Sequence, residues 1–271
     1  MANASIFKNP ADSLFRPQKR SGLLVSVRNI EEAELVLRQN VEVLDLKEPL
    51  AGALGAVSDR VIEQVQRLVK RFAPERRPKL SFALGELVDW DFQRWPCLLD
   101  RFALDQIAGF SYVKIGLAGT QQWNDWPFVW SELFAGLPDN IQPVVVGYLD
   151  RFPSSTLSNG CCPPIEQLIK FAKEQPQVSM LLLDTHDKQD DLFASIGDQR
   201  LHDVIAMAAD AKLATAVAGS VKIDMLPRVI QAGASLVGVR GAVCGGDRSG
   251  QLSEQKLIDF RQQLEEINRA V

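Results

Sequence analysis

The stretch VEVLDLKEP, residues 41–49, decides the fold because it reads as a buried strand that ends in charged side chains. Valine and leucine supply most of the run, and Asp45 and Lys47 fall where the strand should end. A lysine at the end of so apolar a strand is costly to bury. Its presence therefore points to an amine that takes part in chemistry.

Two further stretches repeat this arrangement. FSYVKIGLAG, residues 110–119, places Lys114 in an apolar run, and MLLLDTHDKQD, residues 180–190, places Asp184 and Lys188 after one. Several such lysines in one chain favour covalent amine catalysis on a small phosphorylated carbonyl compound.

Short apolar runs recur along the whole chain and alternate with amphipathic stretches. The runs are GLLVSV (22–27), VEVLDL (41–46), KLSFAL (79–84), SYVKIG (111–116), QPVVVG (142–147), SMLLLD (179–184), LATAVA (213–218) and ASLVGV (234–239). The stretches at 30–40, 59–72, 164–175 and 201–212 have the apolar spacing of helices. Strands that alternate with helices are expected to be parallel, so the sequence predicts the α/β class. Eight such units favour closure into a single (β/α)8 TIM barrel over an open sheet.

Length and composition agree with one large domain. The chain has 271 residues, of which 46% are apolar. A barrel of this kind takes about 250 residues. We therefore expect a TIM-barrel catalytic domain over residues 22–271, preceded by a flexible N-terminal arm over residues 1–21.

Charge and cysteine usage exclude several function classes. The chain has 34 acidic and 30 basic residues and no basic tract, so nucleic acid is not an expected partner. No apolar run has the length of a signal peptide or a membrane span, so we expect a cytoplasmic protein without a membrane partner. The four cysteines lack zinc-site spacing and no nucleotide-binding glycine motif occurs. No metal or cofactor is expected.

Barrel geometry brings the charged residues together. Lys47, Lys114 and Asp184 end or follow the second, fourth and sixth strands, and alternate strands supply one interior layer of a barrel. Two ammonium groups in a partly desolvated pocket lower the pKa of one of them, which yields an amine able to attack a carbonyl. Asp45 and Asp184 would orient that amine and move protons. The simpler interpretation, that each lysine only pairs with an acid at the rim, is less favoured because all three charges share strand ends.

Glycine-rich segments follow the last two strands and predict a phosphate site. AVAGSVK and GVRGAVCGGDRSG occupy the positions at which these barrels bind phosphate through backbone N–H groups. The candidates are Gly219, Ser220, Gly238, Arg240, Gly241 and Ala242. The alternative is that the glycines only allow tight turns. Asp247 and Arg248 are weaker candidates that could pair with each other, and KEPLAGALGA, residues 47–56, could close over a substrate.

Tryptophans cluster in the middle third of the chain, and no basic residues accompany them. We interpret them as core or subunit-interface packing, and a homo-oligomer is expected. They are Trp90, Trp95, Trp123, Trp126 and Trp130.

Five segments together resemble the (5-formylfuran-3-yl)methyl phosphate synthase family, whose members make the furan precursor of methanofuran. The segments are LLVSVRNIEEAELVL, LDLKEPLAGALGA, YVKIGLAG, LLLDTHDK and LVGVRGAVCGGDR, and the likeness runs from about residue 22 to about residue 261. The resemblance implies a barrel that condenses two molecules of glyceraldehyde 3-phosphate and releases phosphate and water. Such an enzyme is a carbon–oxygen lyase acting on phosphates, of class EC 4.2.3, and needs no metal.

The resemblance also implies roles for individual residues. Lys47 would form the Schiff base, with Asp45 beside it. Lys114, Asp184 and Lys188 match the other charged positions of the family pattern.

Two alternatives stay open. One is a different enzyme on the same scaffold, either another class I aldolase or a metal-free decarboxylase that uses aspartate and lysine electrostatically on a sugar phosphate. The other is a barrel that binds a sugar phosphate without catalysis.

Overall fold

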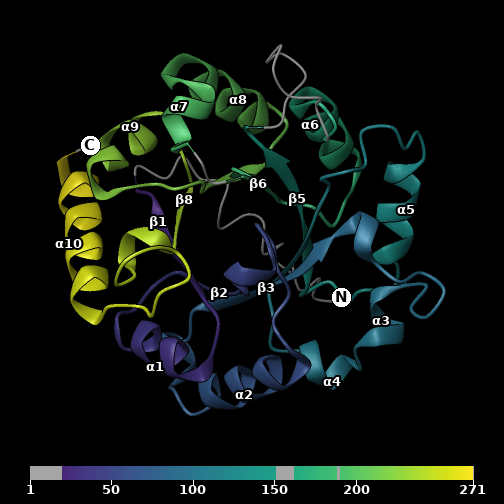
Figure 1. Ribbon diagram of the computed structural model, residues 1–271, viewed down its shortest axis with the longest axis horizontal. Coiled ribbons are helices and arrows are strands. Elements are labelled where there is room, and N and C mark those ends of the chain that lie inside the picture. The colour runs from purple at the N-terminus through teal and green to yellow at the C-terminus, as the bar shows by residue number, and fades with distance from the viewer. Residues whose placement is uncertain (1–19, 151–161, 188–189, 271) are drawn as a thin grey trace, which may run out of the picture.

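The computed structural model describes residues 20–150, 162–187 and 190–270. Within these residues, eight parallel strands pair in chain order and close between β8 and β1, which confirms the predicted single (β/α)8 TIM barrel (Figure 1). The strands are β1 (Gly22–Val27), β2 (Val43–Leu46), β3 (Lys79–Glu86), β4 (Tyr112–Gly116), β5 (Gln142–Tyr148), β6 (Met180–Asp184), β7 (Ala214–Val217) and β8 (Leu236–Val239).

Helices surround the barrel (Figure 1). They are α1 (Ile30–Arg38), α2 (Asp59–Val69), α3 (Leu98–Arg101), α4 (Leu104–Ile107), α5 (Trp126–Leu133), α6 (Ile165–Glu174), α7 (Leu192–Ile196), α8 (Asp198–Asp210), α9 (Leu226–Gln231) and α10 (Glu254–Ala270). Short 3-10 turns follow several strands, at η2 (Pro49–Ala51), η4 (Leu87–Asp89), η5 (Ile223–Met225) and η6 (Gly241–Val243), and η3 (Pro74–Arg76) precedes β3. The tryptophan-rich stretch after β3 is divided between η4 and the short helices α3 and α4.

Side-chain alternation along the strands creates two apolar layers. Leu24, Val43, Val144 and Leu182 belong to the cluster inside the barrel. Their neighbours along each strand, such as Val25, belong to the larger cluster between the sheet and the helices. Each fully buried side chain of this size contributes about 1.5–3 kcal/mol through burial. Trp90, Trp126 and Trp130 are buried in the outer layer, which confirms them as core residues, whereas Trp95 and Trp123 are partly buried and pack against it. The expectation that no basic residues accompany the tryptophans is wrong, because the guanidinium groups of Arg94 and Arg101 lie over the Trp95 ring.

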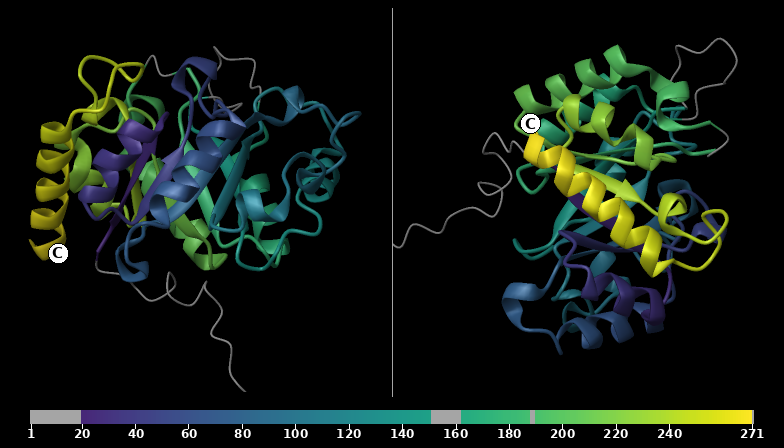
Figure 2. Two further views of the ribbon diagram at one scale, coloured as in Figure 1. Left: turned by 90° about the horizontal axis from the view of Figure 1, so that it is seen from below. Right: turned by 90° about the vertical axis from the view of Figure 1, so that its left-hand side faces the viewer.

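The register places polar residues at the carboxyl end of the barrel interior. Asp45 on β2 lies opposite Ser26 on β1 and Ser81 on β3. Farther round the barrel, Tyr148 on β5 lies opposite Asp184 on β6. In Figure 2, left, the loop that leads into α10 (yellow) lies at the upper end of the barrel. The carboxyl end of that helix lies at the lower end.

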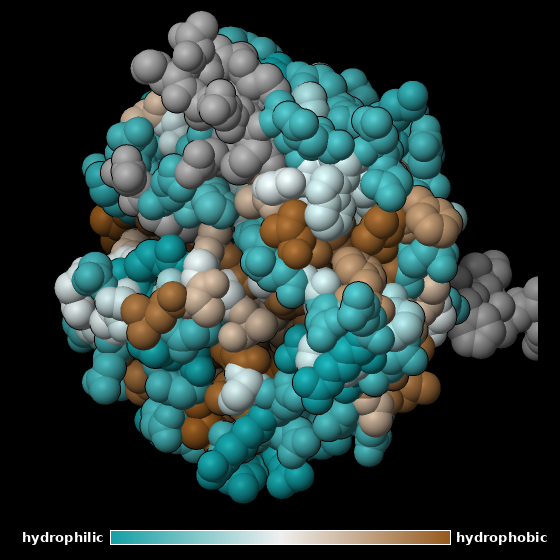
Figure 3. Space-filling view, turned by 45° about the vertical axis from the view of Figure 1, so that its right-hand side comes forward, coloured by the Kyte–Doolittle hydropathy of each residue, from teal (hydrophilic) through white to brown (hydrophobic). Residues whose placement is uncertain are grey.

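The face shown in Figure 3 is mostly hydrophilic. On the face shown in Figure 3, hydrophobic residues form separate patches among hydrophilic ones. The large hydrophobic side chains that are exposed are Leu50, Val88, Leu104, Phe128 and Ile223. No helix in the described parts combines the length and the apolar character that crossing a bilayer requires. Residues 1–19, most of the predicted N-terminal arm, lie outside the described residues.

Candidate active site

A cavity of about 350 Å³ opens at the carboxyl ends of the strands. Its floor contains Asp45, Lys47, Lys114 and Asp184, which come from β2, β4 and β6 or directly follow them. The wall on the side of β7 and β8 contains the candidate phosphate residues, which are Gly219, Ser220, Gly238, Arg240, Gly241 and Ala242. The structure therefore brings together ten of the eleven residues selected from the sequence. Lys188, the eleventh, lies outside the described residues.

The four floor residues form two ion pairs that cross between strands. Lys114 Nζ lies 2.6 Å from Asp45 Oδ1, and Lys47 Nζ lies 3.7 Å from Asp184 Oδ2. All four residues are buried. Each aspartate also accepts a neutral hydrogen bond, Asp45 from the Ser26 hydroxyl at 2.9 Å and Asp184 from a backbone N–H at 2.8 Å. These bonds fix the carboxylates, which in turn fix the amines.

The two lysines differ in how tightly they are held. The Lys114 side chain is 4% exposed and its ammonium group is in direct contact with Asp45. The Lys47 side chain is 10% exposed and lies more than 1 Å farther from its carboxylate. A close carboxylate favours the charged form of an amine, which cannot act as a nucleophile. Lys47, which is more exposed and farther from its carboxylate, is therefore the better placed of the two to reach a carbonyl in the cavity.

The loop after β7 turns through two successive residues with left-handed backbone angles. Gly219 and Ser220 both have positive φ, at 95° and 56°. Successive turn residues of this kind can direct their N–H groups into one concave site. A side chain at Gly219 would lie within 3.0 Å of Thr185, and one at Gly238 would meet Ala218 at 3.0 Å. The neighbouring residues thus leave little room for a side chain at either position.

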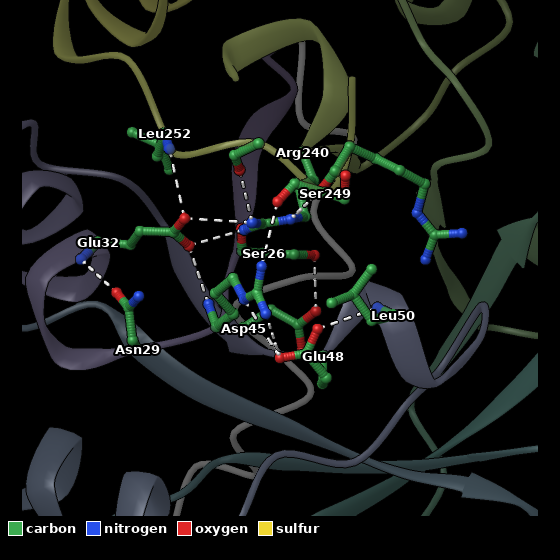
Figure 4. Close-up of polar contacts among 12 residues, drawn as sticks. Ser26, Asn29, Glu32, Asp45, Glu48, Leu50, Arg240, Ser249 and Leu252 are labelled. Atoms are coloured by element: carbon green, nitrogen blue, oxygen red, sulfur yellow. Dashed lines mark hydrogen bonds and ion pairs between the residues drawn. The ribbon is translucent and has the colours of Figure 1, made fainter. Parts of the chain in front are cut away.

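Arg240 is committed to the protein itself (Figure 4). Its guanidinium donates two hydrogen bonds to the Glu32 carboxylate, at 2.7 and 3.1 Å. Its other donors bind the carbonyl oxygens of Ser26, Arg248 and Gly250. These five bonds use all five N–H groups of an arginine. Arg240 therefore anchors the loop before α10 to β1 and α1, and its guanidinium has no N–H group left for a phosphate in this arrangement.

Arg248 is better placed than Arg240 to donate hydrogen bonds to a ligand. It borders the cavity and donates to the carbonyl oxygen of Gly52 at 2.7 Å. Burial lowers the pKa of Arg248, which nevertheless stays charged at neutral pH. The contact joins the loop before α10 to the loop after β2, which carries Gly52. The sequence had suggested instead a pair between Arg248 and its neighbour Asp247, whose carboxylate accepts from Ser249.

Glu86 and Tyr148 form a second polar cluster that sequence reasoning missed. The Tyr148 hydroxyl donates to Glu86 Oε1 at 2.5 Å, and the Ala118 N–H donates to Glu86 Oε2 at 3.0 Å. Burial raises the pKa of Glu86 and raises that of Tyr148 well above its usual range. The one signal available in the sequence was a glutamate that ends an apolar strand, as Asp184 does.

The sequence predicts no metal site. Among the described residues, no three histidine, cysteine, aspartate or glutamate side chains gather as metal ligands would. The cavity floor instead presents amines and carboxylates, which suit imine formation and proton transfer.

Known proteins resemble this chain over most of its length. A family model described as 4-HFC-P synthase matches residues 23–261. The (5-formylfuran-3-yl)methyl phosphate synthase of Methanosarcina barkeri is 29% identical, over 88% of this chain and 96% of that protein. The protein of the same name from Methanobrevibacter smithii is 30% identical, over 84% of this chain and 91% of that protein.

A solved structure with a similar fold is 3-hexulose-6-phosphate synthase from Salmonella typhimurium. It aligns with a TM-score of 0.55 and covers 90% of this chain and 99% of its own. At 15% identity, this likeness shows the barrel fold alone.

Proposed function

The chain belongs to the 4-HFC-P synthase family, and from this premise we propose that it condenses two molecules of glyceraldehyde 3-phosphate into (5-formylfuran-3-yl)methyl phosphate. The reaction proceeds through a Schiff base on Lys47 and releases one phosphate and two waters. The product serves methanofuran biosynthesis.

The observation that carries this proposal is the pair of unequal ion pairs on the cavity floor. Both lysines line the cavity, but the Lys47 amine lies 3.7 Å from Asp184, whereas the Lys114 amine lies 2.6 Å from Asp45. A charged Lys114 in the same pocket disfavours a second cation beside it. One amine thus serves as nucleophile while the other remains a cation.

The chemistry follows from these positions. One glyceraldehyde 3-phosphate first isomerises to its ketone, dihydroxyacetone phosphate. The Lys47 amine adds to the carbonyl of this ketone, and loss of water gives an iminium ion. This ion draws electrons from the neighbouring carbon, so a C–H bond there becomes acidic. The enamine that results adds to the aldehyde of the second triose phosphate. The Lys114 ammonium stabilises the alkoxide that forms.

Substrate phosphates would bind on the wall formed by β7 and β8. The backbone of Gly219 and Ser220 supports one phosphate there, and Arg248 supplies a cation at the edge of the cavity. Arg240 acts indirectly, because it holds the loop that carries Arg248. A cavity of about 350 Å³ suits ligands of triose-phosphate size.

One observation favours the decarboxylase alternative. Both lysines are ion-paired in the substrate-free site, and a decarboxylase needs them as permanent ammonium ions. That enzyme would form no covalent adduct. The non-catalytic alternative gives no reason for two buried amines, because phosphate binding alone does not need them.

Product formation tests the proposed function. The purified protein should convert glyceraldehyde 3-phosphate into a species with furan ultraviolet absorbance and the mass of (5-formylfuran-3-yl)methyl phosphate, and should release phosphate in equal amount. Lys47→Arg should abolish both signals, whereas Arg67→Ala on the exposed face of α2 should preserve them. Release of carbon dioxide from a sugar-phosphate acid, without furan, would support the decarboxylase instead.

A further inference from the structure

The Glu86–Tyr148 cluster lies one layer above the amine cluster, on the side of the mouth. Lys114 and Gly116 are two residues apart on β4, so both face the barrel interior. A side chain at Gly116 would overlap both the Glu86 carboxylate and the Tyr148 hydroxyl. Glu86 and Tyr148 therefore fill the space beside Gly116, the interior position that follows Lys114 on β4.

The same pair lies next to the second ion pair. Tyr148 pairs in register with Asp184 across β5 and β6, and the backbone N–H of Leu149 donates to the Asp184 carbonyl at 2.8 Å. The titratable groups that face the pair are His186, Asp89, Asp184 and Cys162. The ring of His186 packs edge-on against Tyr148 with centroids 5.1 Å apart.

Glu86 differs from the floor carboxylates in the groups that it binds. Asp45 and Asp184 each hold a lysine ammonium group. Glu86 is held by a hydroxyl and a backbone N–H, and in the described residues it forms no ion pair with lysine or arginine. A carboxylate that neutralises an ammonium is a weak base, whereas one held by neutral donors can accept and return a proton near neutral pH.

Burial adds to the difference between Glu86 and the two aspartates of the cavity floor. Glu86 is half-buried and Tyr148 is fully buried. Desolvation raises the pKa of Glu86 toward the range in which general acids and bases work. Tyr148 stays protonated because burial and the nearby carboxylates raise its own pKa. The hydroxyl therefore remains a donor and orients the carboxylate.

We propose that Glu86 is the proton-transfer residue of the reaction and that Tyr148 positions it, an inference that rests on the proposed function. When the Lys47 iminium forms, the neighbouring C–H bond breaks and its electron pair forms the carbon–carbon double bond of the enamine. The proton goes to a Glu86 oxygen. In the later dehydration, Glu86 returns this proton to the leaving hydroxyl and the C–O bond breaks to release water. The electron pair of the neighbouring C–H bond forms the new carbon–carbon double bond, and its proton passes to solvent.

Exchange of hydrogen isolates this step. Dihydroxyacetone phosphate is incubated with enzyme in D2O, and NMR follows deuterium uptake at the carbon next to the carbonyl. Glu86→Gln should slow the exchange by about 10²- to 10⁴-fold, the usual contribution of a general base. The same variant should still give the Lys47 adduct on borohydride reduction, because amine addition does not need Glu86.

The pH profile separates proton transfer from a structural role. The hydrogen bond from Tyr148 lowers the pKa of Glu86, so its loss in Tyr148→Phe should move the acidic limb of the exchange rate to higher pH. Tyr112→Phe is the matched control, because Tyr112 is a buried interior tyrosine whose hydroxyl accepts from Lys79 near the opposite end of the barrel. Its profile should match the wild type.

The outcomes distinguish this inference from the proposed function. Glu86→Gln exchange within about threefold of the wild type, or an unmoved acidic limb in Tyr148→Phe, would overturn the role of Glu86 while the Schiff base stands. Loss of the Lys47 adduct in Glu86→Gln would also overturn it, because Glu86 would then build the site rather than transfer protons. Failure of the wild type to give any adduct would overturn the proposed function itself.

Discussion

Asp45 binds Lys114 on β4 at 2.6 Å and does not pair with Lys47, its neighbour two residues along the chain. Side chains at such positions project in parallel from a strand, about 6.6 Å apart. A residue on another strand approaches more directly across the barrel interior. Because Asp45 binds Lys114, Lys47 pairs with Asp184 instead, at the longer distance of 3.7 Å. The proposed catalysis depends on this difference between the two amine–carboxylate distances.

Loss of Arg248 should weaken substrate binding. Arg248→Ala removes a cation from the edge of the cavity and the bond from its loop to Gly52. We expect the KM for glyceraldehyde 3-phosphate to rise by about tenfold or more, which corresponds to a charge-assisted hydrogen bond of roughly 1.5–3 kcal/mol. Steady-state kinetics measures this, and an unchanged KM would remove Arg248 from the binding site.

Loss of Glu32 should destabilise the fold. Glu32→Gln leaves the buried Arg240 guanidinium without its counter-charge, and both residues are nearly inaccessible. Breaking a buried pair costs about 3–5 kcal/mol. Each kcal/mol lowers Tm by about 2–4 °C in domains of 150–250 residues, the nearest size class. The control is Asp198→Asn, which breaks an exposed pair with Arg228 and should change Tm little. Equal effects of the two variants in calorimetry would contradict the anchoring role of Arg240.

The contribution of Glu86 to the free energy of unfolding should fall as the pH rises. Its pKa is raised on folding, so the folded protein binds the proton more tightly than the unfolded chain. The stability that protonation provides is present below the unfolded pKa and is lost as the pH rises through the folded pKa. Glu86→Gln cannot ionise, so its Tm relative to the wild type should increase from about pH 4 toward neutral pH and then level off. A constant difference across this range would show that ionised Glu86 is not strained by burial.

The turn at Gly219 should tolerate no side chain. Gly219→Ala places a methyl group against Thr185 in a backbone with φ of 95°. The matched control is Gly197→Ala, where φ is also positive, at 74°, but no atom lies within 4 Å of the new carbon. Both variants incur the backbone strain of about 1–2 kcal/mol. In thermal unfolding, inorganic phosphate should raise the Tm of Gly219→Ala less than it raises the Tm of Gly197→Ala. An equal rise in both variants would place the phosphate elsewhere.

The sequence predicted the barrel because burial on both faces leaves a strong local signal. The first strand has the predicted bounds, Gly22–Val27, and the other seven overlap their predicted ranges. The convergence of Lys47, Lys114 and Asp184 also followed from barrel geometry, since each lies at or near the carboxyl end of an even-numbered strand. Strand alternation and closure order suffice for such a prediction.

The side-chain pairs at the site could not be predicted from the sequence in the same way. Arg240 sits in a glycine-rich segment typical of phosphate sites, yet Glu32, which holds it, lies 208 residues earlier on α1. Tyr148 and Glu86 are 62 residues apart and meet only because Gly116 leaves room between their strands. Such contacts depend on which side chains reach one another after closure. Local sequence patterns do not encode them.

The most direct test of the central claim is borohydride reduction in the presence of glyceraldehyde 3-phosphate, followed by intact-protein mass spectrometry and peptide mapping. We predict a single adduct on Lys47, which is lost in Lys47→Arg and retained in Lys173→Arg, a control in the last turn of α6. An adduct on a different lysine, or none although the substrate is shown to bind, would contradict Schiff-base catalysis by Lys47.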